Sequence, residues 1–214
     1  MSRSTDELIA ALRRVEIPTL GHFLEEGFCD QDLRPMNSGP QLVGRARTLD
    51  LTEPDAFAVN RALLALAPGD VLVIRVAGRG HAPVGAVTAH AAIAQSAAGI
   101  VVDGPVTDRA ALRELQDRLP VFATGLTART TKRSGALAGE TDGALDRVIE
   151  VAGVSVRPGD LVLGDAQGIL ILPPEGPGDD VLDAALASDA AEPALVARIA
   201  SGEPLSAILA TGTD

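Results

Sequence analysis

The sequence predicts an α/β protein with a mixed sheet and a C-terminal helical tail. Between residues 42 and 126 the segments read alternately as strand and helix, which is typical of right-handed crossovers between parallel strands. Short strands divided by turn residues follow, and the last segment is Ala-rich and helical in pattern. We therefore expect an α/β domain with N-terminal helices over residues 1–175 and a helical tail over 176–214.

The composition is that of a globular protein with few aromatic side chains. Hydrophobic residues make up 46% and charged residues 22% of the 214 positions, with no Trp, no Tyr and four Phe. Scarce aromatic residues disfavour single-stranded nucleic-acid binding by stacking, and a net charge of −11 disfavours binding to phosphate backbones. No segment resembles a signal core or a membrane span, so we expect a cytoplasmic protein without a nucleic-acid or membrane partner.

Two helices are expected before the sheet. Ser4 or Thr5 precedes acidic residues and apolar residues at helical spacing, so the first helix should begin there. Pro18 should begin a second helix that ends at Gly27. A loop rich in Pro, Gly, Asn and Asp then leads to the first strand at residue 42.

The central segments predict strands and helices in alternation. Residues 42–51 alternate apolar and polar side chains, which favours a strand with one face toward solvent. Further strands are expected over 71–78, 100–104 and 120–126, and helices over 55–67, 83–99 and 109–119.

After residue 126 the pattern changes. Residues 127–146 form a long polar loop without a period, in which Lys132 and Arg133 should be solvated unless a neighbouring subunit meets them. Residues 147–175 predict three short strands in an antiparallel layer, and the helical tail should be interrupted by Pro193 and Pro204.

The turn between the strand at 100–104 and the next helix carries two carboxylates, Asp103 and Asp108. Asp103 is expected to shape the turn, and Thr107 or Asp108 could simply cap the helix that follows. The alternative is a ligand site at this edge of the sheet. The preceding helix starts near Gly85, and its N-terminal N–H groups would attract a carboxylate or phosphate. Asp108 could then share a divalent cation with an acidic substrate.

Other motifs give weaker signals. The stretch AGRGHAPVG has neither G-x-G-x-x-G nor a Gly-Lys-Ser ending, so it is only a weak signal for a nucleotide-binding loop. His22, His81 and His90 lack H-x-x-x-H spacing, which disfavours zinc, and His81 is the best placed to contact a ligand. Cys29 is the only cysteine, so an intrachain disulfide is impossible, and we expect an ordinary residue that is buried or half-buried.

Several segments together resemble the RraA-like family. They are LVGRARTL, PGDVLVIRVAG, PVGAVTAHAAIAQSAAGIVVDGPVTDRAAL, PVFATGL and GVSVRPGDLVLGDAQGILILP, in this order, within residues 5–174. The family includes the regulator of RNase E activity and the class II 4-hydroxy-4-methyl-2-oxoglutarate aldolases. The resemblance implies a swivelling β/β/α sandwich, usually assembled as a ring-shaped homotrimer or a hexamer.

For the aldolases, the resemblance also implies a site at the subunit interface. A Gly-Glu-Leu-Leu-type stretch offers backbone amides to the carboxylate of pyruvate or oxaloacetate, and here it is Gly85, Ala86, Val87 and Thr88. After the acidic position and twenty intervening residues comes an Arg-Asp pair, in which Asp binds Mg²⁺ or Mn²⁺ and Arg stabilises the enolate. The pair falls on Thr107 and Asp108. The spacing is intact, but the acidic position is Ala86 and the Arg position is Thr107.

These departures leave two functional hypotheses. One is a metal-dependent lyase for a small 2-oxo acid, with Asp108 as the metal ligand and Thr107 in the Arg position. A replacement charge could come from Arg75, Arg79 or His81, and a base from a neighbour's Asp189, Glu192 or Glu203. The other is a non-catalytic binding or regulatory member of the family, or an enzyme for another acid. A methyltransferase is not supported, because no S-adenosylmethionine loop is present.

Overall fold

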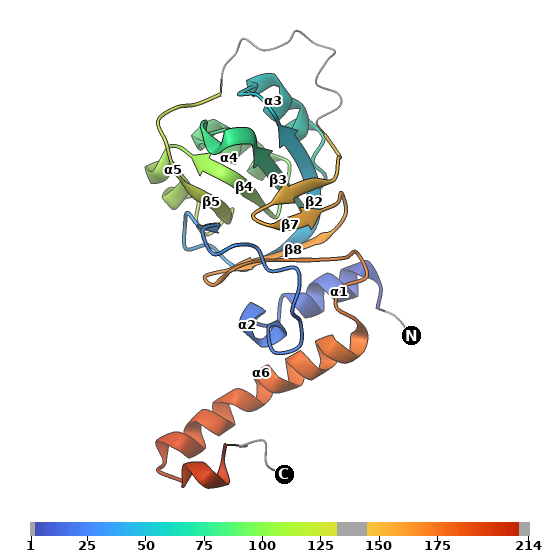
Figure 1. Ribbon diagram of the computed structural model, residues 1–214, viewed down its shortest axis with the longest axis vertical. Coiled ribbons are helices and arrows are strands. Elements are labelled where there is room, and N and C mark those ends of the chain that lie inside the picture. The colour runs from blue at the N-terminus through green and yellow to red at the C-terminus, as the bar shows by residue number, and fades with distance from the viewer. Residues whose placement is uncertain (1–2, 132–144, 210–214) are drawn as a thin grey trace.

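The computed structural model describes residues 3–131 and 145–209 and has the α/β architecture expected from the sequence (Figure 1). Its main sheet has the strand order β1-β5-β4-β3-β2-β8-β9. The strands are β1 (Arg34–Pro35), β2 (Leu42–Leu51), β3 (Asp70–Val76), β4 (Gly99–Val106), β5 (Val121–Leu126), β8 (Leu161–Asp165) and β9 (Gly168–Leu172). A separate hairpin is formed by β6 (Ile149–Val151) and β7 (Val154–Val156).

The sheet is mixed and nearly closed. Strands β2, β3, β4 and β5 run parallel, whereas β1 pairs antiparallel with β5 and β8 pairs antiparallel with β2. The end strands β1 and β9 also lie next to each other. Because the central strands are parallel, the turns that follow β3, β4 and β5 meet at one edge, which is where α/β proteins bind ligands.

Six helices surround the sheet in the described residues. They are α1 (Thr5–Leu12), α2 (Ile17–Leu20), α3 (Ala56–Leu64), α4 (Ala86–Ala94), α5 (Arg109–Glu114) and α6 (Asp179–Ala200), with short 3-10 turns at Ala77–Arg79 and Leu205–Ala207. Helices α3, α4 and α5 cover one face, and α1, α2 and the first half of α6 pack below β8, as Figure 1 shows. The second half of α6 extends away from the body.

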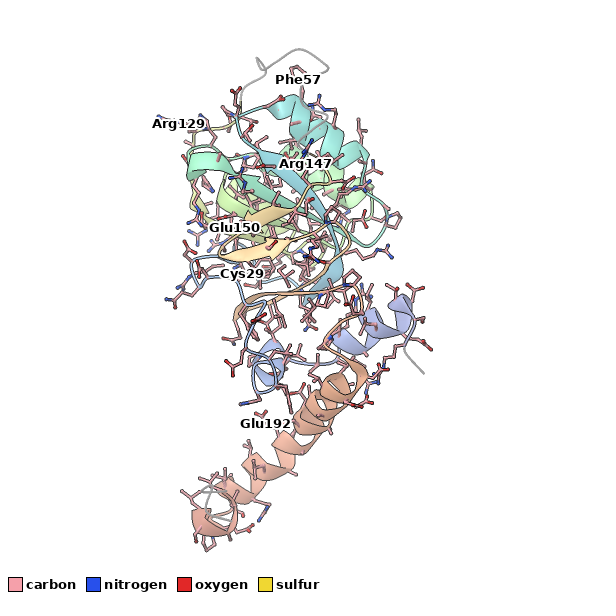
Figure 2. All side chains as sticks on the ribbon, turned by 45° about the vertical axis from the view of Figure 1, so that its right-hand side comes forward. Cys29, Phe57, Arg129, Arg147, Glu150 and Glu192 are labelled. Atoms are coloured by element: carbon pink, nitrogen blue, oxygen red, sulfur yellow. The ribbon has the colours of Figure 1, made fainter. Side chains whose placement is uncertain are left out.

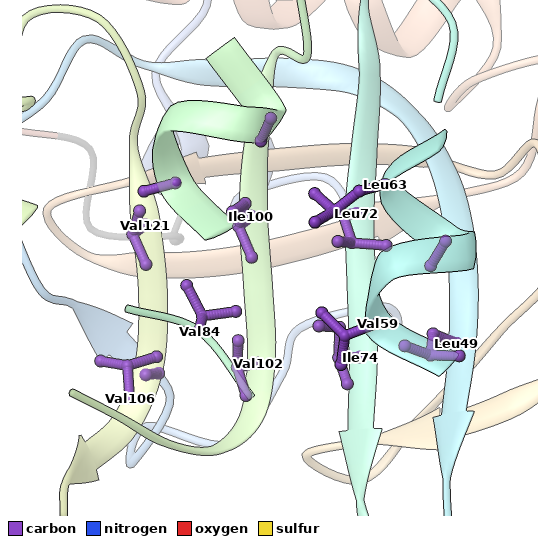
Figure 3. Close-up of a cluster of buried hydrophobic side chains, with 14 of the residues drawn as sticks. Leu49, Val59, Leu63, Leu72, Ile74, Val84, Ile100, Val102, Val106 and Val121 are labelled. Atoms are coloured by element: carbon purple, nitrogen blue, oxygen red, sulfur yellow. The ribbon is translucent and has the colours of Figure 1, made fainter. Parts of the chain in front are cut away.

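The core consists of three apolar clusters. The first lies between β3, β4 and the helices, where Leu72 lies close to Leu63 and Ile74 lies close to Val59 (Figure 3). The second fills the space between the other face and the β6–β7 hairpin, and the third joins β8 and β9 to α1, α2 and α6. Aliphatic side chains supply nearly all of these contacts, as the shortage of aromatic residues requires.

Several predicted elements are confirmed. Ser4 caps α1, and the side chain of Glu7 accepts the Ser4 N–H in return, which completes a capping box. The strand over 42–51 has the predicted bounds, although both of its faces are largely covered. The predicted helices over 55–67, 83–99 and 109–119 all form but are shorter.

The second helix was predicted to continue to Gly27, and this is wrong. Helix α2 ends at Leu20; residues 21–24 continue as turns with local hydrogen bonds, and the chain then pairs with β9 from Gly27 onward. The Ile171 N–H donates to the Gly27 carbonyl over 2.8 Å, and Phe28 forms a bridge with Leu170. Gly27 adopts a φ of 90°, which a residue with a side chain rarely does.

The C-terminal third also differs from the prediction. Four strands form instead of three, and they divide between the hairpin and the main sheet. Pro193 does not interrupt the tail, since α6 is continuous through it; the ring is exposed, and one backbone hydrogen bond is lost. Pro204 does stand between α6 and the last 3-10 turn. Within the described residues, no helix is long and apolar enough to cross a bilayer.

The side chain of Asn37 stabilises the segment that joins α5 to β5, and its replacement tests this role. Its side chain is 7% exposed; the amide nitrogen donates to the carbonyls of Leu112 and Leu119, and the amide oxygen accepts the Val121 N–H. We expect Asn37→Ala to lower the free energy of unfolding by about 3 kcal/mol, because it leaves buried backbone groups unpaired. Urea denaturation measures this, with exposed Asn60→Ala as the control. Equal stability of the two variants would contradict this role.

Candidate functional site

Asp108 stands at the junction of β4 and α5 in an unusual backbone conformation. Its φ of 54° and ψ of 45° are left-handed, which costs a non-glycine residue about 1–2 kcal/mol. Its side chain makes no capping hydrogen bond to α5. The Asp108 carbonyl accepts the Leu112 N–H over 3.1 Å, as the residue before a helix does, but the carboxylate does not serve α5 and points elsewhere.

The carboxylate of Asp108 reaches the N-terminus of the neighbouring helix, α4. Its Oδ2 accepts the Ala86 N–H over 2.9 Å, and the Thr107 hydroxyl lies 3.4 Å from Oδ1. The backbone links the same two turns, because the Thr107 N–H donates to the Val84 carbonyl over 2.9 Å. These bonds bring together two pairs of residues that lie more than twenty positions apart along the chain, Gly85 and Ala86 in one turn and Thr107 and Asp108 in the other.

Gly85 is what lets the carboxylate approach so closely. A Cβ at this position would lie 2.5 Å from Asp108 Oδ2 and 2.8 Å from Thr107 Cγ2. Its φ of −150° is ordinary extended backbone, so the requirement for glycine comes from space and not from conformation. The turn before α4 and the turn after β4 therefore fit each other only without a side chain at residue 85.

The next residues of α4 offer further donors. Val87 and Thr88 lie in the first turn of a nine-residue helix, where backbone N–H groups have no preceding helical carbonyl to accept them. The side chain of Val87 is 85% exposed, and the Thr88 hydroxyl donates to the Pro83 carbonyl over 3.3 Å. This end of the helix dipole favours a bound anion, and the exposed Asp108 beside it favours a cation.

A third segment borders the site and was missed in the sequence reasoning. The Thr127 N–H donates to the Val106 carbonyl over 3.0 Å, and the Ala82 N–H donates to the Arg129 carbonyl over 2.8 Å. Arg129, labelled in Figure 2, is exposed on this segment. It could have been found from the order of the strands, because residues after β5 must reach the same edge as those after the parallel strand β4.

The arginines considered as replacements for the missing cation are already paired. Arg75 donates to Asp50 over 2.8 Å, and this hydrogen bond raises the pKa of Arg75. Arg79 pairs with Asp32 at 2.9 Å and with Asp103 at 2.7 Å. Asp103 is buried and also accepts a backbone N–H from the β6–β7 turn, so its contacts are structural.

The other singled-out residues do not join the site through any contact in the described residues. Asp189 accepts hydrogen bonds from the Glu16 N–H and the Thr19 hydroxyl, and Glu203 pairs with Arg198. Glu192 is exposed on the protruding part of α6 (Figure 2).

Cys29, His90, Lys132 and Arg133 also have side chains that could take part in chemistry. Burial, and then the charges of Asp103 and Asp30, raise the pKa of Cys29 to about 12, so its thiol is unreactive near neutral pH. His90 contacts the Ala86 carbonyl through Nδ1 at 2.8 Å. Lys132 and Arg133 lie outside the described residues.

The candidate site offers a divalent cation one protein carboxylate, that of Asp108. Within the described residues, no group of three His, Cys, Asp or Glu side chains is arranged to hold a metal ion. Asp108 can supply one carboxylate oxygen and Thr107 a hydroxyl, which suits an ion such as Mg²⁺ that keeps most of its ligands as water or substrate oxygens.

Comparison with known proteins identifies relatives of both functional types. The chain is 36% identical over 154 residues to a putative 4-hydroxy-4-methyl-2-oxoglutarate aldolase from Halalkalibacterium halodurans, covering 72% of this chain and 69% of the relative. Its fold matches RraAS2 of Streptomyces coelicolor, an unusual member of the RNase ES inhibitor RraA family, with a TM-score of 0.74 and 27% identity over 92% of this chain and 100% of that one.

A second solved structure supports the same assignment. The RNA-processing inhibitor RraA from Thermus thermophilus matches with a TM-score of 0.64 and 30% identity, over 77% of this chain and 95% of that one. The family model described as RraA-like, Aldolase/RraA, covers residues 16–171, which include all of the main sheet except the last residue of β9, and both turns of the candidate site. The chain therefore belongs to the RraA-like family.

Proposed function

We propose that this protein is a divalent-metal-dependent lyase that acts on a small 2-oxo acid, as an aldolase or an oxaloacetate decarboxylase. The observation that carries the proposal is the Asp108 carboxylate, which crosses to the N-terminus of α4 instead of capping its own helix. The similarity to a putative aldolase supports it.

Different groups of the chain would bind the substrate, hold the metal ion and stabilise negative charge. The N–H groups of Val87 and Thr88 would bind the substrate carboxylate, as helix N-termini bind anions. Asp108 would hold Mg²⁺ or Mn²⁺, which when bound polarises the 2-oxo group and so favours cleavage of the neighbouring carbon–carbon bond. Arg129, on the segment that borders both turns, is the candidate for the cation that Thr107 does not supply.

The proposal includes a homotrimer or hexamer in which a neighbouring subunit helps to close the site. The second half of α6 supports an association, because it leaves the body and exposes Leu195, Val196 and Ile199. Apolar side chains gathered on one exposed segment are typical of interfaces.

A non-catalytic regulator is the second candidate. It is favoured by Ala86 and Thr107, which replace the acidic residue and the arginine of the aldolase signature, and by the fold match to proteins named as inhibitors of RNA processing. An arginine that stabilises developing negative charge contributes about 3 kcal/mol to a transition state, so its loss weakens the case for fast turnover.

Asp108→Asn tests the proposal directly. Asparagine keeps an oxygen that can accept the Ala86 N–H but loses the charge that would hold the metal ion. We expect kcat/KM for oxaloacetate decarboxylation and for aldol cleavage to fall by more than about 100-fold, beyond the loss typical of an outer-sphere metal partner. The exposed Asp117→Asn is the matched control. Turnover that is insensitive to EDTA and to Asp108→Asn would refute a metal-dependent lyase with Asp108 as its metal ligand, and absence of turnover in every sample favours the regulator.

Gly85→Ala tests the placement of the carboxylate. The added methyl group would overlap Asp108 Oδ2 and Thr107, so we expect a loss of about 1–3 kcal/mol in stability together with a lower kcat. Gly125→Ala is the control, since a Cβ there meets nothing within 4 Å. Activity and urea denaturation should separate the two variants, and indistinguishable behaviour would show that the close approach is unimportant.

Restoring the aldolase signature tests the scaffold. Thr107→Arg combined with Ala86→Glu should raise kcat/KM for oxaloacetate by at least about tenfold, because arginine adds a donor for the developing enolate charge. Thr107→Gln with Ala86→Glu is the neutral control. No difference between the two double variants would show that residue 107 does not face the reacting oxygen.

A further inference from the structure

A cavity of about 540 Å³, called the α5 cavity below, lies between α5, the loop before β2 and the turn between β8 and β9. One of its walls includes Phe122, near the N-terminal end of β5, whereas Asp108 follows the C-terminal end of β4. Because β4 and β5 are parallel, Phe122 lies toward the opposite edge of the sheet from Asp108, although Arg109 directly follows Asp108 in the chain. Its volume suits a small metabolite.

Two arginines of α5, Arg109 and Arg113, line the cavity. They are one helical turn apart, which places like charges side by side and disfavours the helix. Both are exposed, and neither has an ion pair or a side-chain hydrogen bond to another part of the described chain. The chain has 29 acidic and 18 basic residues, so carboxylates were available to neutralise them.

A second cavity differs from the α5 cavity in the pairing of its arginines. A cavity of about 680 Å³ beside the β6–β7 hairpin is also lined by two arginines, Arg75 and Arg79. There each guanidinium is paired with a carboxylate, so that cavity has no unpaired positive charge to offer. Of these two cavities, only the α5 cavity presents guanidinium groups that have no carboxylate partner in the described chain.

The remaining lining of the α5 cavity defines the kind of ligand. Gln116 and Ser38 add neutral polar groups, and Phe122 and Met36 add apolar surface. Its single lining carboxylate, Asp165, accepts the Gln167 N–H over 2.7 Å. An anion with a short carbon body would meet both positive charge and apolar surface in this cavity.

We propose that the α5 cavity binds a small organic dianion, either a dicarboxylate or a phosphate monoester. The guanidinium groups of Arg109 and Arg113 form the anion-binding part, since their donor geometry matches carboxylate and phosphate oxygens. Gln116 and Ser38 provide further hydrogen-bonding groups. This site does not depend on the lyase activity, because none of its residues belongs to the α4 site.

Isothermal titration calorimetry at constant ionic strength tests the proposal with succinate, glycerol 3-phosphate, inorganic phosphate and acetate. We expect saturable binding of succinate or of glycerol 3-phosphate, with acetate at least about tenfold weaker because it carries one charge. The probe that binds more tightly shows whether the natural ligand is a dicarboxylate or a phosphate monoester. Arg109→Gln combined with Arg113→Gln should weaken binding at least about tenfold, whereas Arg14→Gln, an exposed arginine outside the cavity, should leave it unchanged.

A second measurement locates the ligand. Phenylglyoxal modification followed by mass spectrometry should show that the bound dianion slows the reaction of Arg109 and Arg113 but not that of Arg14. The proposal is overturned if neither organic dianion saturates below about 10 mM, a weak affinity for a built site. Equal binding by the double variant, unprotected arginines, or equal affinity for inorganic phosphate would overturn it as well.

Discussion

The hydrogen bond from the Ala86 N–H to the Asp108 carboxylate joins the two turns on which the candidate site depends. It fixes the start of α4 against the end of β4, and it requires glycine at residue 85. The left-handed backbone of Asp108 is the cost of aiming that carboxylate away from its own helix. Strain of this kind persists only where surrounding contacts hold it, and here the parallel β3–β4 pairing and the Thr107–Val84 hydrogen bond do so.

The distribution of charge separates the structural groups from the available ones. Asp50, Arg75 and Asp103 are register partners across β2, β3 and β4, so their charges alternate along one row of the sheet. Arg79 extends this row by pairing with Asp103. These groups neutralise one another, whereas Asp108 and the arginines of α5 have no ion-pair partner in the described chain. A ligand of opposite charge can neutralise such an unpaired group at a sheet edge or in a cavity, which makes these groups candidates for binding sites.

Much of the fold followed from periodicity and turn residues, and the failures share one cause. The alternating segments predicted β2 to β5 and their helices, and Ser4 was identified as a possible cap. The prediction was wrong where distant backbone competed with local preference. The chain after α2 pairs with β9 at Gly27 and Phe28 instead of continuing the helix to Gly27. Helix α5 stops at Glu114, in a connection whose Leu112 and Leu119 carbonyls accept hydrogen bonds from the Asn37 side chain. Local propensity carries no information on such partners.

By itself, the sequence determined the order of elements, the family and the spacing that places Ala86 and Thr107 at the signature positions, because these depend on local pattern. Only the tertiary structure decided that the Asp108 carboxylate crosses to α4, that Arg75 and Arg79 are committed to carboxylates, and that Arg129 borders the turns. Such relations join residues far apart along the chain. They are set by strand order and close packing, and no local pattern encodes the direction in which a side chain points once the sheet has formed.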